Sequence, residues 1–246
     1  MDDSSSKENN PFDIQNDSNA VEDILLDTIN KMRKDDPLIG AKLGAKEVIN
    51  SLMSMMNDSN GIHIETFMCA LGSLAGYSCQ ASLRKELIEL KGLDEKQVFA
   101  VVFTNDGSKY FFGDLINKPL AEDEYSVWSL AAGAVQYLGI NEIIDVEDIF
   151  KHVAETVGNH NYGIPRIPEG HEPMDMPYNF VKFLWPLFLP IAEKYCDAPN
   201  EWPIMFGLSV QEGIILGKDV LNPLLSLSLA MESAIPMAKV DIIELK

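Results

Sequence analysis

The chain has 246 residues, of which 46% are hydrophobic and 23% are charged, which is the profile of a folded soluble protein. Its 38 acidic residues outnumber 19 basic ones and give a net charge of −19, and no run of basic residues is longer than two. Because phosphate backbones and anionic membrane surfaces bind clustered Lys and Arg, this composition excludes nucleic acid and membranes as partners.

The cysteine content is low, and it indicates no metal or redox motif. Cys69, Cys79 and Cys196 form no CxxC pair, so neither a zinc ribbon nor a thioredoxin-like centre is predicted. Each stands in or beside an apolar stretch, where free cysteine behaves as a small buried hydrophobe. The first residues lack the regions of a secretory signal, and no apolar window is strong enough for a membrane span. We therefore expect a cytosolic protein.

The first third of the chain predicts an acidic tail followed by three helices. Residues 1–18 are polar and offer little surface to bury, so they are expected to be disordered. A helix should begin with Asn19 as its cap and end near Asp35. Apolar periodicity predicts a second helix over about residues 40–56 and a third over about residues 64–90.

Two glycines mark one face of the third predicted helix. Gly72 and Gly76 are four residues apart and therefore share a side of the helix. Small residues at this spacing let a second helix approach closely. In a soluble chain they predict tight packing in the core.

A β-hairpin is predicted over about residues 97–112. Runs of β-branched and aromatic residues flank Asn105, Asp106 and Gly107, and the Asp-Gly pair favours a hairpin turn because glycine accepts positive φ. An isolated hairpin is marginal in water, so it should lie on helices or gain a third strand. Residues 240–245 are a candidate for that strand.

Two helices with recognisable ends are predicted after the hairpin. One covers about residues 124–138, and Gly139 follows it as the residue that ends the helix. It has almost no polar face, so it should lie centrally. The other covers residues 145–157 and has Asp145 as its cap.

The last part of the chain predicts three more apolar helices. Residues 178–195 contain Pro186 and Pro190, each of which removes a backbone donor and clashes with the preceding turn, so a kink or break is expected. Residues 202–216 and 223–235 each start beside a proline and complete the set.

The predicted fold class is mostly α. We expect one domain of about seven or eight helices over residues 19–246, carrying the small hairpin. The segment 158–177 is an exception, because Gly and Pro punctuate it too often for a helix or strand. Structureless segments of this length in compact domains are usually functional or disordered. We expect an ordered loop, and it is the best place to search for a site.

The candidate site surrounds this loop, and its residues are His152, Glu155, His160, Tyr162, Arg166, His171 and Glu172. Three of them, His160, His171 and Glu172, have ligand atoms that suit zinc, iron or manganese if the loop brings them together. A metal-bound water could then hydrolyse an ester or amide. Solvated loops commonly carry such side chains without any site, and this simpler interpretation is favoured, so no cofactor is expected.

Other motifs in the sequence are incomplete. Residues 213–219 resemble a phosphate-binding loop, but the glycines are one residue too close and an acid replaces the magnesium-binding hydroxyl. His63 and Glu65 have the H-x-E spacing of zinc deaminases without the cysteine pair that completes the site. Glu212 and Glu232 lie in apolar helical windows, where a buried carboxyl has a raised pKa, although each could equally occupy a wet stripe of its helix.

The function favoured by the sequence is contact with other proteins, without catalysis. The chain is very acidic, and methionine clusters can form an adaptable surface; the clusters are Met53, Met55 and Met56, then Met174 and Met176. A protein partner or a homo-oligomer is therefore expected. One alternative is a metal-dependent hydrolase at the loop 158–177. A second is a binder of a small apolar ligand in a helical pocket, for which the sequence singles out no residue.

Overall fold

The computed structural model describes residues 24–242. The predicted tail, residues 1–18, and the end of the proposed third strand, residues 243–245, lie outside the described range. The chain divides into two compact units, of which the first ends at Gly40 and the second begins at Ala41. In the first unit, residues 24–32 are helical, as the sequence predicts.

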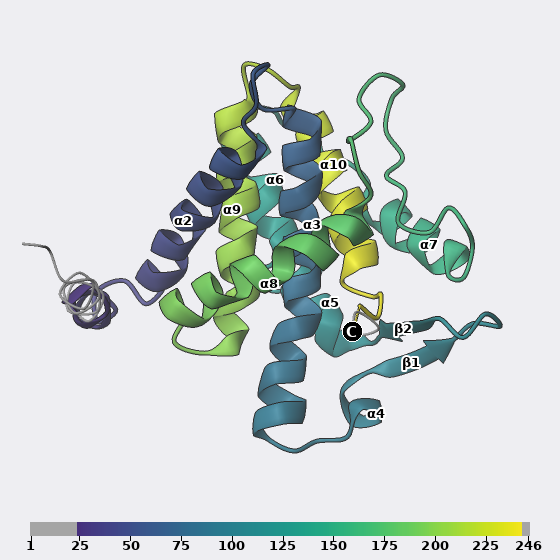
Figure 1. The fold of residues 1–246 in the computed structure, drawn as a ribbon, viewed down its shortest axis with the longest axis horizontal. Coiled ribbons are helices and arrows are strands. Elements are labelled where there is room, and N and C mark those ends of the chain that lie inside the picture. The colour runs from purple at the N-terminus through teal and green to yellow at the C-terminus, as the bar shows by residue number, and fades with distance from the viewer. Residues whose placement is uncertain (1–23, 243–246) are drawn as a thin grey trace, which may run out of the picture. The chain divides into compact units, whose positions relative to one another are not determined.

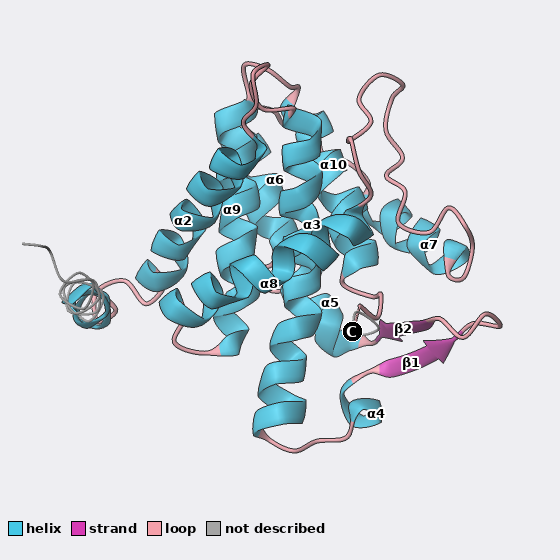
Figure 2. Ribbon diagram, in the orientation of Figure 1, coloured by secondary structure: helices cyan, strands magenta, loops and turns pink. Residues whose placement is uncertain are grey.

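Helices dominate the described residues, and one two-stranded antiparallel hairpin accompanies them (Figures 1 and 2), which confirms the predicted fold class. In chain order the elements are α2 (Ile39–Met56), α3 (Ile64–Leu83), η1 (Arg84–Leu90), α4 (Glu95–Val98), β1 (Ala100–Phe103), β2 (Lys109–Phe112), α5 (Asp114–Asn117), η2 (Lys118–Glu122), α6 (Val127–Tyr137), α7 (Val146–Thr156), α8 (Pro177–Tyr195), η3 (Pro199–Glu201), α9 (Trp202–Gly217) and α10 (Pro223–Met237). No helix among residues 24–242 combines the length and the apolar character needed to cross a membrane.

Helix α3 forms the centre of the second unit. Every residue from Thr66 to Ser82 is buried, and α9 and α10 pack beside it. The backbones of α3 and α10 come very close, because a Cβ atom on Gly72 or Gly76 would collide with the backbone of α10. The glycine pair therefore has the role in tight core packing that its spacing predicts.

Helix α8 lies on α3 and runs without interruption from Pro177 to Tyr195. Trp185 packs edge-on against Tyr77 of α3, with ring centroids 5.0 Å apart. Of the kink or break expected at Pro186 and Pro190, a break does not occur. Both prolines are exposed, so water can satisfy the carbonyl groups that lose their intrahelical donors, and the helix continues.

The hairpin is confirmed, but it is shorter than predicted. Residues 97–98 belong to the helical turn α4, so β1 begins only at Ala100. Gly107 has a φ of +87° in the turn, which explains the Asp-Gly signal. A bridge between Tyr110 and Val240 attaches the chain after α10 to β2, so the third strand is reduced to a single bridge within the described residues.

Helix α6 begins at Val127, three residues later than predicted, because the Ser126 side chain accepts a hydrogen bond from the Ser129 N–H and caps it there. Asp145 caps α7 as expected by accepting from the Asp148 N–H. The third predicted helix reaches residue 90, but its last part, η1, is π-helical rather than α-helical. A second π-helical segment, η2, follows α5.

Candidate functional site

Three attachments hold the segment 158–177 against the helices beside it. The first is Tyr162, whose hydroxyl donates to the Pro236 carbonyl oxygen of α10 over 2.9 Å. Its ring packs edge-on against Tyr110 of the hairpin, with centroids 4.8 Å apart. Burial raises the pKa of Tyr162 well above its ordinary value, and the neighbouring Tyr110 adds to the rise.

Arg166 makes the second attachment and joins the loop to two helices. Its Nε and Nη2 atoms lie 2.9 and 2.8 Å from Oε1 of Glu232 in α10. Its Nη1 atom lies 2.8 Å from Oδ2 of Asp148 in α7. Of the two positions that the sequence allows for Glu232, buried or on a solvated side of its helix, the structure shows the buried one. Arg166 supplies the opposite charge that a buried carboxylate requires.

The third attachment involves His171 near the end of the loop. Its Nδ1 atom lies 2.8 Å from Oε1 of Glu65, and Nε2 of His63 lies 3.6 Å from the other carboxylate oxygen. The Met174 N–H donates to the Thr66 hydroxyl over 2.9 Å. Burial alone would raise the pKa of Glu65, but the hydrogen bond with His171 and the nearby histidine charges hold it below its ordinary value.

The remaining candidate residues of the loop are not brought together. His152 and Glu155 lie on α7, His160 is exposed, and the Glu172 carboxylate accepts from a backbone N–H of the loop itself. Within residues 24–242, no three His, Cys, Asp or Glu side chains are grouped as metal ligands would be. The proposed ligand set of His160, His171 and Glu172 therefore has no common centre. Tyr162, Arg166 and His171 fasten the loop.

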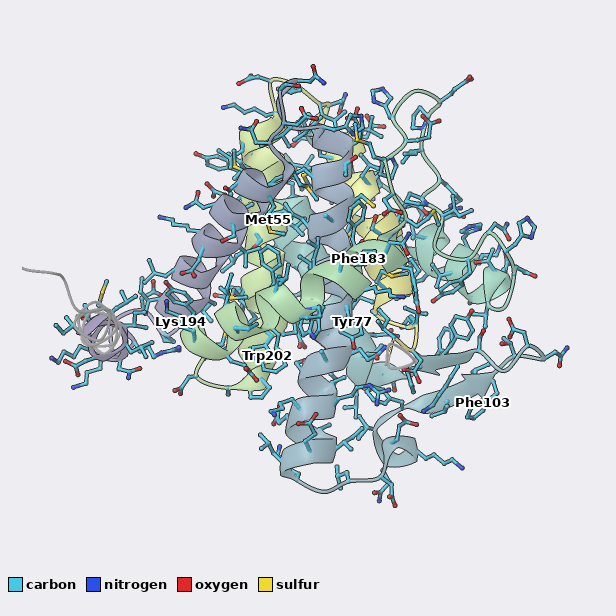
Figure 3. All side chains as sticks on the ribbon, viewed as in Figure 1. Met55, Tyr77, Phe103, Phe183, Lys194 and Trp202 are labelled. Carbon is cyan, nitrogen blue, oxygen red and sulfur yellow. The ribbon has the colours of Figure 1, made fainter. Side chains whose placement is uncertain are left out.

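An exposed apolar surface lies on the outer side of α8. Phe183, labelled in Figure 3, is 63% exposed and Leu187 is 57% exposed, and Pro186 and Pro190 are exposed with them. Steps of three and four residues place all four side chains on one side of the helix. We call this set the α8 outer face. The opposite side of α8 holds the buried residues Phe180, Val181, Leu184 and Phe188.

The α8 outer face is almost without charge in a very acidic protein. Lys182, Glu193 and Lys194 are the charged residues of α8, which gives the helix a net charge of +1 (two bases minus one acid) while the chain carries −19. Lys182 and Glu193 are about three helical turns apart, so both lie along the same flank of the α8 outer face. Lys182 therefore stands near one end of the apolar strip, and Glu193 and Lys194 stand near the other end.

A cleft of about 380 Å³ lies between η1, η2 and the start of α9. Both π-helical segments of the described chain contribute to its lining, through Glu86 of η1 and through Lys118 and Pro119 of η2. We call it the η1–η2 cleft. The sequence does not predict this cleft, because a π-helical turn has no simple signature in apolar periodicity and the lining comes from distant parts of the chain.

Lys239 was also missed. The side chain is 1% exposed, and its Nζ atom donates to Oδ1 of Asn117 over 2.6 Å. The ammonium lies 5.4 Å from the ring centroids of both Phe112 and Phe150. Burial lowers the pKa of Lys239 to about 8, and the nearby Cys79 and Glu122 counteract only part of that shift. A single lysine that follows a predicted helix gives no sign of such burial.

No protein family, curated protein or solved structure matches this chain.

Proposed function

We propose that the protein acts through protein–protein contacts, and that its partner is a second copy of the same chain bound through the α8 outer face. The observation that carries the proposal is the strip of four exposed apolar side chains on one side of α8, including Phe183 and Leu187. A contiguous apolar surface of this kind, bordered by polar groups, marks an interaction site. Exposed aromatic residues supply much of the binding energy at such sites.

The charges that border the strip favour a second copy as the partner. When two identical helices pack antiparallel about a two-fold axis, residues on the same flank face each other. An axis close to Leu187 brings Lys182 of one copy near Glu193 of the other, and the same pair forms twice. The α8 outer face is thus complementary to itself in charge as well as in apolar character.

The net negative charge of the rest of the molecule opposes this contact. Two chains of charge −19 repel each other, and only a nearly uncharged surface such as the α8 outer face allows them to approach closely. Salt screens the repulsion, so association should strengthen as the ionic strength rises. The proposal also places the protein in the cytosol, which is supported by three buried cysteines that form no disulfide.

The test compares two substitutions of exposed phenylalanines by sedimentation velocity over a range of protein concentrations. Phe183→Glu should raise the dimer dissociation constant by about 30-fold or more, because it places two carboxylates in a contact whose central residues are each worth about 2 kcal/mol. Phe103→Glu is the matched control, since Phe103 is 65% exposed on the hairpin and lies outside α8. It should leave the dissociation constant unchanged.

Two results contradict the proposal. The first is a wild-type protein that stays monomeric at all protein concentrations and salt levels, because it then does not self-associate. A dimer that Phe103→Glu weakens as much as Phe183→Glu does is not built on the α8 outer face. Circular dichroism of both variants distinguishes either result from loss of folding.

A further inference from the structure

The η1–η2 cleft has the local structure of a binding site. π-Helical turns are rare, and they occur frequently at functional sites because they displace side chains and backbone groups from regular positions. Here η1 and η2 are more than 25 residues apart in the sequence, yet both border the same cleft. The end of α3, the start of α9, the turn before α6 and residues of α5 and η3 complete its walls.

The walls of the cleft are mainly apolar and its size suits a small molecule. Leu83, Leu115, Pro119, Tyr125 and Ile204 provide apolar surface from five different parts of the fold. Leu115 and Tyr125 are exposed although both side chains are large, so the structure leaves apolar surface uncovered at this cleft. A volume of about 380 Å³ falls within the range of roughly 300–1,000 Å³ that small-molecule pockets occupy.

The charged side chains of the cleft define the polar part of the ligand. Glu86, Asp123 and Glu124 contribute three negative charges, against one positive charge from Lys118. Lys91 lies 2.7 Å from Glu86 and neutralises it in part, whereas Asp123 and Glu124 are exposed next to the apolar wall. The field of the whole acidic chain acts in the same direction, attracting cations and repelling anions.

We propose that the η1–η2 cleft binds a small organic amine, with its apolar body against Leu115, Tyr125 and Ile204 and its ammonium group beside Asp123 and Glu124. Burial of the apolar body provides most of the affinity, because the removal of apolar surface from water is the main driving force for binding in such a cleft. The exposed carboxylates select the charge of the head group. This site uses none of the residues of the α8 outer face, so it does not depend on self-association.

Three ligands with the same body and different head groups test the proposal: 4-phenylbutylamine, 4-phenylbutanol and 4-phenylbutyrate. Binding to the full-length protein is followed by NMR titration near neutral pH. The amine should bind saturably and about tenfold more tightly than the carboxylate, and the alcohol should lie between them. Asp123→Asn combined with Glu124→Gln should reduce the preference for the amine at least threefold and leave the affinity for the alcohol unchanged.

A substitution that fills the cleft locates the ligand. Leu115→Trp should weaken binding of all three compounds at least tenfold, while the control Leu90→Trp, at an exposed position of η1 outside the lining, should have no effect. Three results would each overturn the proposal. The first is equal affinity for the three head groups, and the second is that the amine does not bind saturably. The third is that neither the Leu115→Trp variant nor the charge-removing variant changes binding. If Leu115→Trp unfolds the protein, the charge-removing variant alone decides.

Discussion

Lys239 shows how a single buried charge ties distant segments together. Its backbone carbonyl accepts from the Phe111 N–H over 2.7 Å, so it attaches the hairpin to the chain that leaves α10. Its ammonium meanwhile donates to Asn117, at the junction of α5 and η2. Among residues 24–242 no carboxylate forms an ion pair with Lys239, and a lysine buried in this way is unfavourable in its charged form. The burial that allows this contact therefore also lowers the pKa of Lys239.

Lys239 predicts a pH dependence of stability with a definite sign. The folded protein releases this proton near pH 8, whereas an unfolded lysine keeps it to about pH 10.5. Between these values the unfolded chain binds more protons, so the free energy of unfolding rises with pH. From pH 7 to pH 9, wild type should gain about 1 kcal/mol relative to Lys239→Met, measured by urea denaturation. An unchanged difference between the two proteins would show that the ammonium is not desolvated.

The sequence indicates which residues of the loop 158–177 form contacts, but not which contacts they make. Tyr162, Arg166 and His171 stood out because polar and aromatic side chains are conspicuous in a loop rich in Gly and Pro. The sequence could not show that these residues bind Pro236, Glu232 and Glu65, because those partners come from α10 and α3. Lys239 gave no signal at all, since its burial depends on Asn117, Phe112 and Phe150.

Among the elements, helix ends and the glycine pair were predictable because their causes are local. Asp145 caps α7 through a backbone group three residues away, and Gly139 takes the positive φ that follows α6. The π-helical form of η1 and the continuity of α8 depend instead on packing and on exposure to solvent. The sequence predicts a kink or break at Pro186 and Pro190, but α8 continues through both of these exposed prolines.

The contact between α3 and α10 yields a prediction at this scale. Gly76→Ala adds a methyl group that meets the Ala234 backbone, so it should lower the free energy of unfolding by about 2–3 kcal/mol through overpacking. Gly133→Ala is the matched control. It lies inside α6, and its new methyl group has no neighbour within 4 Å, so it should stabilise the protein by up to about 1 kcal/mol through helix propensity. Chemical denaturation measures both changes, and equal effects would contradict the close approach of the two helices.

For the whole molecule, the distribution of charge matters more than its total. The chain carries −19, but the charged residues of α8 sum to +1, and this helix also exposes Phe183 and Leu187. The sequence predicted an acidic, mostly α protein that works through contacts with proteins. It could not place the contact surface, because α8 is apolar on nearly all sides and only its packing on the rest of the fold, which includes the contact of Trp185 with Tyr77, determines which side faces outward.

The most direct test of the proposed self-contact is an exchange of charges between Lys182 and Glu193, followed by sedimentation velocity near 0.1 M salt. Lys182→Glu and Glu193→Lys each place like charges together twice across an antiparallel α8 pair, so each alone should raise the dimer dissociation constant about tenfold. The double exchange re-creates both opposite-charge pairs and should return the dissociation constant to within about twofold of wild type. A double variant that associates no better than the single variants would contradict the pairing of α8 with α8.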